Sequence, residues 1–489
     1  MRRRPFVFLV LMALLAPARA GAAWIRSWET GAAGPYPYAT LGPSQYAFPR
    51  DEAIDQTMRM IVHLSAGGKR LRVHFTNVAG RNPVTFDGLR VARRSSGPAV
   101  DPASSRSLTF GGASSLTIPA GEEAISDPVD LATETGQDLA ITFHVVGESG
   151  PMTWHGSAFA FTYTSGQRAG NVGGDMSGHA MPIPLQSWFF VDGVDIAGGA
   201  ATSTVVGFGD SLTDGFVTAP DRNDRYTDLL GPRLGPAFSV VNAGISGNSI
   251  SRARNAETDP YAGPPGVDRF DRDVLDVAGV RTVIVFEGTN DLSVDAPVSV
   301  IQDALTEVTE RAHAAGVCVI GATLTPRSDG ILPYSWNAGV YEPRRVELNN
   351  WMRSSAAPFD ALADLDLALR DPLNERELRP AYNAGDGVHF STAGRQAVAD
   401  TIPTDVIRGC ATPPPPPCRH RVVVRLPPDL RHVQIRVGRT WRRVAPGTRR
   451  VVLRPAAGTV TVRVRARRAS GAAYARTRRV RICATTLRP

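Results

Sequence analysis

Cysteine is scarce in this chain of 489 residues, which has only 4. That number is too small for a domain held together by a dense disulfide framework, but it allows two bridges. Cys418 and Cys483 bracket the last segment, so we expect them to pair, which leaves Cys318 with Cys410. The alternative for Cys318, in the apolar stretch 317–321, is that it is only a small buried residue. No cysteine or histidine pair has the spacing of zinc ligands, so we expect no structural metal.

Long apolar runs are missing after the N-terminus. Three arginines follow Met1, and after them come an apolar run at residues 6–15 and the segment Ala18-Arg-Ala20, which has small residues at the positions that a signal peptidase reads. This pattern is typical of a signal peptide, here residues 1–20, with a second cleavage site after Ala22. The apolar core is shorter than the ~20 residues of a membrane span, which makes an anchor the lesser alternative. We therefore expect a secreted, extracellular protein without a transmembrane segment.

Lysine is nearly absent, and arginine is concentrated at the C-terminal end. After Cys418 the chain has 20 arginines and one acid, Asp429, so the charge of this segment exceeds the formal +8 of the whole chain. Stretches such as Val460-Thr-Val-Arg-Val-Arg alternate arginine with apolar residues. Period-two alternation predicts a small antiparallel β-domain over residues 418–489, with one arginine-lined face. The proline-rich residues 411–417 before it predict a stiff, extended linker.

An arginine-lined face on an exported protein can hold an anionic cell-envelope polymer or an acidic polysaccharide. The alternative is a solvated sheet surface in an arginine-rich proteome. Few aromatic residues lie among the arginines and no nucleic-acid-binding motif is present, so we expect no nucleic-acid partner.

The motif around which we organise the chain is Gly207-Phe-Gly-Asp-Ser-Leu-Thr-Asp-Gly. It follows the β-branched run Ser203-Thr-Val-Val and precedes a helix-like segment at residues 224–234, which predicts a strand, a tight turn and a helix. Ligands bind at the strand ends of open α/β sheets. Ser211, in this turn, is therefore a candidate nucleophile, although small polar residues also crowd turns that have no function.

Three further stretches follow predicted strands or precede a predicted helix: Asn242-Ala-Gly-Ile-Ser-Gly-Asn, Glu287-Gly-Thr-Asn-Asp and Asp386-Gly-Val-His-Phe. With the first motif, in this order, they resemble the four block motifs of the SGNH, or GDSL-type, serine hydrolases (esterases and lipases). The resemblance covers roughly residues 202–407, and no block residue is substituted. It implies a carboxylic ester hydrolase that needs no cofactor, with a three-layer α/β/α, flavodoxin-like domain.

The resemblance also implies roles for individual residues. Ser211 matches the nucleophile, His389 the base and Asp386 the acid that orients it; the oxyanion-hole donors match the N–H groups of Ser211 and Gly247 and the amide of Asn290. The chemistry requires such a set, because a serine hydroxyl is a poor nucleophile until an imidazole, held in one tautomer by a carboxylate, accepts its proton. The charge that develops on the carbonyl oxygen must meet donors already in place.

Residues 201–410 alternate strand-like and helix-like segments, which predicts a parallel sheet covered on both faces. The charged run Arg269-Phe-Asp-Arg-Asp has the pattern of an exposed helix face. We expect Asp214 and Asp291 to fix turns rather than to act as acid or base. The predicted helices are residues 224–234, 297–315, 342–355 and 392–407.

Residues 24–200 contain short segments rich in β-formers, such as residues 158–163, and little helical periodicity. This pattern predicts an N-terminal β-sandwich, or jelly-roll-like, domain. Its tryptophans can form a core or a sugar-stacking platform, and buried aromatics are the commoner use. The short join at 198–201 predicts that this domain packs closely against the next one. The tryptophans in question are Trp24, Trp28, Trp154 and Trp188.

Together these features predict a secreted esterase that forms an acyl-enzyme, with acetyl or other short acyl esters on polysaccharides as the leading substrates. Lipid esters, and hence an extracellular lipase, are the alternative within the same chemistry. From a different class, the chain could be an envelope- or polysaccharide-binding protein with a vestigial hydrolase domain. The intact block residues argue against that last alternative.

Overall fold

The computed structural model describes residues 23–36, 47–48, 51–253, 260–328, 338–410, 422–426, 430–437, 440–448, 450–453, 458–468 and 473–482. The expected signal peptide, the proline-rich linker and both members of the expected Cys418–Cys483 bridge lie outside these residues. Among the described helices, none is long and apolar enough to cross a membrane.

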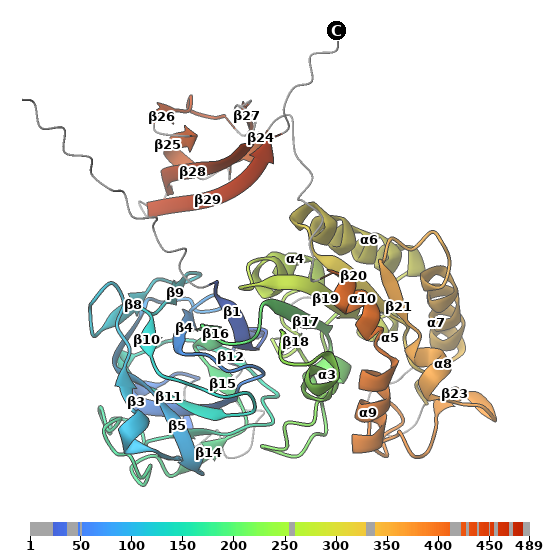
Figure 1. Cartoon of the computed structure of the whole chain (residues 1–489), viewed down its shortest axis with the longest axis horizontal. Coiled ribbons are helices and arrows are strands. Elements are labelled where there is room, and N and C mark those ends of the chain that lie inside the picture. The colour runs from blue at the N-terminus through green and yellow to red at the C-terminus, as the bar shows by residue number, and fades with distance from the viewer. Residues whose placement is uncertain are drawn as a thin grey trace, which may run out of the picture.

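The N-terminal region is built of antiparallel sheets, as the alternation predicts (Figure 1). One sheet has the order β1-β16-β4-β10, with β9 also on β4, and a second has the order β14-β13-β3-β11-β5-β6, with β7 and β8 also on β5; β15-β12-β2 is a third. The strands of the first sheet are β1 (Ile25–Glu29), β16 (Val191–Ala197), β4 (Arg70–Thr76), β10 (Val129–Asp130) and β9 (Glu123–Ile125). Those of the second are β14 (Ile183–Leu185), β13 (Thr162–Thr164), β3 (Ile54–His63), β11 (Asp138–Glu148), β5 (Val84–Ser96), β6 (Ala99–Val100), β7 (Arg106–Ser107) and β8 (Leu116–Ile118). The third contains β15 (Trp188–Phe189), β12 (Thr153–His155) and β2 (Gly34–Pro35). Outside the sheets, a short 3-10 helix, η1, spans Pro102–Ser104.

Apolar side chains from all three sheets share one core, so the sheets pack face to face. Trp28, Trp154 and Trp188 are buried in this core, which makes them packing residues rather than an exposed sugar platform. Trp24 is half-buried, and the Arg72 guanidinium lies over its ring at 4.6 Å.

The strand expected over residues 158–163 is wrong, because only its last two residues belong to a strand, β13. Before β13 the backbone bends: Phe159 has a φ of 47°, and its carbonyl accepts a hydrogen bond from the Asp221 N–H at 2.8 Å. The bend and this contact with the following domain interrupt the strand before β13, although the Phe161 carbonyl still accepts a hydrogen bond from the Ile61 N–H at 3.0 Å.

The middle domain contains a parallel sheet in the order β18-β17-β19-β20-β21. This is a doubly wound order: from β17 the chain adds β18 on one side and then β19, β20 and β21 on the other. The point where the strand order switches, between β17 and β19, leaves a crevice at the carboxyl ends of these two strands. The predicted parallel sheet is confirmed, and its strands are β17 (Ser203–Gly209), β18 (Phe238–Gly244), β19 (Val280–Phe286), β20 (Cys318–Ala322) and β21 (Ala361–Ala363).

Helices cover both faces of this sheet and so form the expected three layers (Figure 1). On one face α3 contacts α9 and α10, and on the other α6 contacts α4, α7 and β20. Their bounds are α3 (Tyr226–Leu234), α9 (Thr392–Thr401), α10 (Thr404–Cys410), α4 (Gly266–Phe270), α6 (Val298–Ala315) and α7 (Ala338–Met352). Shorter elements are α2 (Ser211–Asp214), a π-helical turn η2 (Asp271–Leu275), α5 (Thr289–Ser293), α8 (Leu365–Leu369) and a hairpin of β22 (Arg370–Asp371) and β23 (Asn374–Leu378).

The single last helix expected over residues 392–407 is two helices, α9 and α10. Pro403 lies between them, and Ile402 before it is extended, with φ −64° and ψ 128°. The ring of a proline disfavours the helical conformation at the preceding residue, which explains the break.

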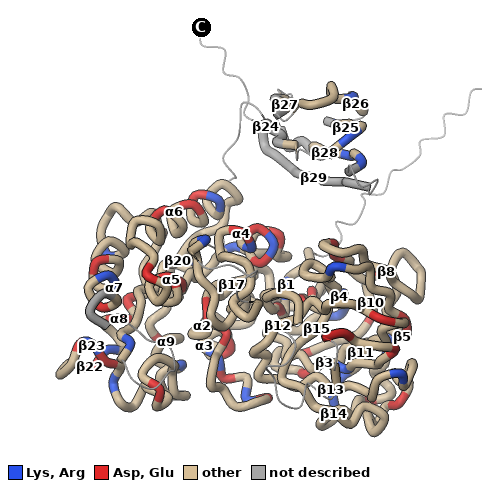
Figure 2. Tube along the Cα trace, turned by 180° about the vertical axis from the view of Figure 1, so that it is seen from behind, with Lys and Arg blue, Asp and Glu red and all other residues tan. Residues whose placement is uncertain are grey.

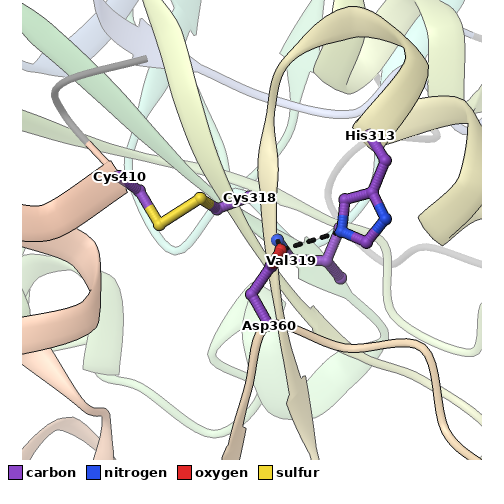
Figure 3. The surroundings of a disulfide bond; sticks show 5 residues. All are labelled: His313, Cys318, Val319, Asp360 and Cys410. Atoms are coloured by element: carbon purple, nitrogen blue, oxygen red, sulfur yellow. Dashed lines mark hydrogen bonds and ion pairs between the residues drawn. A yellow bond between two sulfur atoms is a disulfide. The ribbon is translucent and has the colours of Figure 1, made fainter. Parts of the chain in front are cut away.

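A disulfide joins Cys318, the first residue of β20, to Cys410, the last of α10 (Figure 3). Beside it, the Asp360 carboxylate accepts hydrogen bonds from the Val319 N–H at 2.7 Å and from His313 Nε2 at 2.9 Å. The bridge therefore fastens the end of the domain to the start of a core strand. The expected pairing of these two cysteines is confirmed, and the alternative of a lone buried Cys318 is wrong.

The two domains described so far are hydrogen-bonded to each other, as the short join predicts. The Arg26 N–H of β1 donates to the Ala278 carbonyl at 2.9 Å, and the Arg26 carbonyl accepts from the Ser239 hydroxyl at 2.6 Å. The hydroxyls of Ser65 and Ser239 also lie 2.6 Å apart.

The C-terminal region is antiparallel, as expected. It consists of the pair β24-β27 and the sheet β26-β25-β28-β29. A small core contains Leu426, Val433, Ile435, Val462 and Val464. The strands are β24 (Val422–Arg425), β25 (Leu430–Val437), β26 (Thr440–Arg443), β27 (Arg450–Leu453), β28 (Gly458–Arg468) and β29 (Ala473–Ile482).

Candidate active site

Ser211 lies where the central strand β17 ends and the short helix α2 begins. Asp210 precedes the helix and caps it, because its carboxylate accepts a hydrogen bond from the Leu212 N–H at 2.9 Å. Gly215 ends the helix with a φ of 89°, which glycine adopts without strain. This tight turn holds the Ser211 hydroxyl at the carboxyl edge of the sheet.

A chain of hydrogen bonds joins Ser211 to the loop before α9. The distance from Ser211 Oγ to His389 Nε2 is 2.9 Å, and that from His389 Nδ1 to an Asp386 carboxylate oxygen is 2.6 Å. Because the carboxylate accepts, Nδ1 carries the proton and Nε2 is left to accept one from the serine. The structure thus brings together the three residues that the motifs single out.

The loop of Asp386 and His389 is closed on itself. Asn383 and Phe390 form a β-bridge, and the Asn383 side-chain oxygen accepts hydrogen bonds from the N–H groups of Gly385 and Gly387 at 2.8 and 3.0 Å. The acid and the base are therefore fixed to one small, rigid loop, as their spacing in the sequence predicts.

The environment of Asp386 keeps it ionised. Burial raises its pKa, but hydrogen bonds from the His389 imidazole and from the backbone N–H groups of His389 and Val388 outweigh burial. The net result is a pKa below the ordinary value of an aspartate. A carboxylate, not a carboxylic acid, therefore faces the imidazole.

The second motif forms a turn in which the Asn248 N–H donates to the Ile245 carbonyl at 3.0 Å. Gly247, the third residue of the turn, has a φ of 82°, the left-handed conformation that a type II turn requires there. The third motif supplies Asn290, at the start of α5 after β19. Its amide nitrogen donates to the Asn248 carbonyl at 2.9 Å and to the Asp210 carboxylate at 3.2 Å. To reach a substrate oxygen, this amide has to exchange one of these two bonds, and the bond to Asp210 is the longer.

Asp214 and Asp291 fix turns, as expected. The Asp291 carboxylate accepts hydrogen bonds from the N–H groups of Ile250 and Ser251, both at 2.9 Å. The Asp214 carboxylate accepts from the N–H and the hydroxyl of Ser246, at 2.9 and 2.7 Å.

The expectation that Arg269 lies on an exposed helix face is wrong. Its side chain is 0% exposed and lies beneath the three strand ends of the site. It donates to the carbonyls of Gly209 and Ala243 at 3.0 and 2.7 Å and to the Asn248 side chain at 2.9 Å. The sequence pattern missed this residue, because alternating charges look the same on an exposed helix and in a buried ion-pair network.

The same guanidinium pairs with two buried carboxyl groups and lies 4.0 Å over the Phe208 ring. It donates to Asp273 at 2.9 Å and to Glu287 at 3.3 Å. Burial, together with the nearby Asp210, raises the pKa of Glu287 well above its ordinary value, more than Arg269 lowers it. Burial raises the pKa of Asp210 itself to about 7. The floor of the site therefore contains acids that hold protons to unusually high pH.

The surface beside the Ser211 hydroxyl is apolar on one side. The Phe216 ring lies 4.6 Å from the His389 ring, and Phe216 and Val217 are 38% and 44% exposed. Phe390 also lines the depression here, which is shallow and has almost no enclosed volume. Within the described ranges, no group of three or more His, Cys, Asp or Glu side chains is arranged to hold a metal ion.

The model of the GDSL-like lipase/acylhydrolase family matches residues 208–397, which include all four motifs. No curated protein matches the chain.

Several solved structures are similar to part of the chain. Est24, a carbohydrate acetylesterase from Sinorhizobium meliloti, is 18% identical, covers 42% of this chain and 99% of its own, and gives a TM-score of 0.34. The native aryl esterase of M. smegmatis is 17% identical over 42% of this chain and 99% of its own, with a TM-score of 0.33. The family match over the four motifs identifies residues 208–397 as a GDSL-like lipase/acylhydrolase (SGNH) domain, preceded by an N-terminal β-rich region.

Proposed function

We propose that this protein is a secreted serine esterase that hydrolyses carboxylic esters through an acyl-enzyme on Ser211. The observation that carries the proposal is the unbroken relay of Ser211, His389 and Asp386, with contacts of 2.9 and 2.6 Å. A serine hydroxyl that donates to an imidazole oriented by a carboxylate is the arrangement that activates it as a nucleophile.

The reaction has two steps. Ser211 Oγ attacks the acyl carbon while His389 Nε2 takes its proton, and the imidazolium then protonates the departing alcohol. Water, deprotonated by His389, next attacks the acyl-enzyme and releases the acid. In both steps the N–H groups of Ser211 and Gly247 and the Asn290 amide stabilise the oxyanion, and losing one such donor costs on the order of 100- to 1,000-fold in rate.

The leading substrates are acetyl or other short acyl esters on polysaccharides. The depression beside Ser211 is shallow and encloses no room for a long chain, which supports a short acyl group. The exposed Phe216 and Val217 beside the site favour the alternative, an extracellular lipase acting on lipid esters. A polymer-binding protein with a vestigial hydrolase domain is disfavoured, because the relay is intact.

The test compares the release of p-nitrophenol from acetyl, butyryl and longer acyl esters by the mature protein and by Ser211→Ala. We expect fast acetyl turnover that falls steeply with chain length and vanishes in the variant; release of acetate from an acetylated polysaccharide is then measured. A rise towards long chains would move the assignment to a lipase. No turnover of any ester would refute the esterase.

Export is part of the proposal. Its support is the basic and apolar N-terminal pattern together with the Cys318–Cys410 disulfide, since disulfides persist in oxidising compartments. N-terminal sequencing of protein recovered from culture medium tests it, with residue 21 or 23 expected first.

We also propose that the C-terminal domain binds an anionic cell-envelope polymer or an acidic polysaccharide. Figure 2 shows basic residues along β25 and β28. The guanidinium groups of Arg436 and Arg465 lie 5.0 and 4.2 Å from the centre of the Trp441 ring. An aromatic ring beside cations suits a sugar that carries acidic groups. Co-sedimentation of the full chain with such a polymer, compared with Trp441→Ala, tests this role; equal binding by both would count against it.

A further inference from the structure

His155, at the end of β12, belongs to the N-terminal domain but lies against the helix that begins at Ser211. Its side chain is 2% exposed, and its ring packs on the Trp188 ring with centroids 5.5 Å apart. Its Nδ1 lies 2.9 Å from the Gly31 carbonyl oxygen, and its Nε2 lies 3.1 Å from Asp214 Oδ1. Asp214 is the last residue of α2.

These contacts fix where the protons lie. A carbonyl oxygen only accepts, so Nδ1 must donate to Gly31. Without a further proton, the lone pair of Nε2 would face that of an Asp214 oxygen. A proton therefore lies between His155 and Asp214, and the two side chains share a buried hydrogen bond.

The other oxygen of Asp214 holds the turn of the second motif. It accepts from both the N–H and the hydroxyl of Ser246, the residue before Gly247. The direction of the Gly247 N–H depends on the peptide plane between Ser246 and Gly247. A buried chain of hydrogen bonds thus runs from the N-terminal domain, through Asp214, to the backbone that presents an oxyanion donor.

We propose that His155 is a positioning residue for ester hydrolysis, through which the N-terminal β-domain holds the oxyanion hole of the neighbouring domain in its working geometry. This inference rests on the proposed function. It assigns the N-terminal domain a part in catalysis that the hydrolase motifs do not require.

Further hydrogen bonds between the two domains do not involve His155. The Arg225 guanidinium donates to the carbonyl of Asp214 at 2.6 Å and to that of Ala158 at 2.5 Å. The Arg94 guanidinium donates to the Asp221 carboxylate at 2.7 Å. Replacement of His155 should therefore leave the domains docked, so its effect on the oxyanion hole can be measured separately.

Two substitutions of His155 each keep one of its two hydrogen bonds and remove the other. In His155→Asn the amide nitrogen replaces Nδ1, which keeps the bond to Gly31 and loses Asp214. In His155→Gln it replaces Nε2, which keeps Asp214 and loses Gly31. We expect kcat for p-nitrophenyl acetate to fall about 10- to 100-fold in His155→Asn, less than the loss of a whole donor, with KM within about threefold. His155→Gln should retain kcat within about threefold.

A matched control is His144, another buried histidine of the N-terminal domain. Its ring nitrogens contact Asp87 and Asp55 at 2.8 and 2.9 Å, within that domain. His144→Asn and His144→Gln should lower the unfolding midpoint as much as the His155 variants do, while leaving kcat unchanged.

Equal kcat in His155→Asn and His155→Gln, or losses that follow the unfolding midpoint across all four variants, would overturn the proposal. The rate at which a fluorophosphonate labels Ser211 supplies a readout that needs no ester substrate. If the wild-type chain labels but hydrolyses no ester, the esterase assignment fails, and slow labelling of His155→Asn alone still supports the positioning role. If labelling is equal in both His155 variants, the positioning role fails whatever the substrate is.

Discussion

Replacement of Arg269 by methionine removes a buried guanidinium whose hydrogen bonds hold the floor of the active site. The lost bonds include those to the carbonyls of Gly209 and Ala243, at 3.0 and 2.7 Å, and that to the Asn248 side chain, at 2.9 Å. Methionine fills a similar volume but donates nothing, so acceptors at three strand ends lose a partner that water cannot replace.

The magnitude follows from burial. Removing one partner of a buried ion pair typically costs 3–5 kcal/mol of unfolding free energy. Asp273 keeps a second partner, because the Arg272 guanidinium also donates to it, at 3.1 Å. We therefore expect the lower end, about 3 kcal/mol, which corresponds to a fall in Tm of roughly 6–12 °C for a domain of this size.

The assay is thermal unfolding of the full chain followed by fluorescence, with p-nitrophenyl acetate hydrolysis measured in parallel. Glu287→Gln is the control: the pKa of Glu287 is raised well above its ordinary value, and an amide of the same shape can still accept the hydrogen bond from Arg269. We expect that variant to lie within about 1 kcal/mol of wild type. A Tm for Arg269→Met within about 2 °C of wild type would refute the reasoning.

Three further predictions concern the relay, pH and the disulfide. Asp386→Asn should lower kcat on the order of 1,000- to 10,000-fold, because an amide can hold the His389 imidazole in the wrong tautomer; steady-state kinetics within tenfold of wild type would contradict this. Because burial raises the folded-state pKa of Asp210 to about 7, the stability linked to this group is full at pH 4 and below and is lost as pH rises to 7. The urea midpoint of Asp210→Asn relative to wild type should therefore rise between pH 5 and pH 8, and a constant difference would count against a buried, proton-holding Asp210. Replacing Cys318 and Cys410 by serine opens a bridge with a sequence separation of 92 and should cost about 2–4 kcal/mol in urea unfolding at unchanged kcat; an unchanged midpoint would show that the bridge does not stabilise the fold.

The sequence was sufficient for the sheet because the sheet depends on local signals, and for the relay because the four motifs resemble those of a known family. Each motif of the site lies directly after a strand or before a helix, and Asp386 and His389 share one loop, so their meeting needs no long-range knowledge. The break between α9 and α10 also has a local signal, Pro403. The helical periodicity continues on both sides of it, so periodicity alone predicts one helix there.

The remaining features depend on contacts between distant segments. Arg269 is buried because carbonyl and carboxyl groups from other strands surround it, which no pattern in residues 269–273 reports. His155 lies in no motif, and its contact with Asp214 spans 59 residues and two domains. Residues 158–161 have the composition of a strand, but the positive φ of Phe159 and its bond to the Asp221 N–H interrupt the extended conformation before β13.

The most direct test of the proposed function is to identify the covalent intermediate. Mature protein in steady-state hydrolysis of p-nitrophenyl acetate is quenched in acid, and its peptides are examined by mass spectrometry. The account predicts an acetyl group on the peptide that contains Ser211, and neither acetylation nor turnover in Ser211→Ala. Turnover that persists in Ser211→Ala, or an acetyl group found only on another residue, would contradict it.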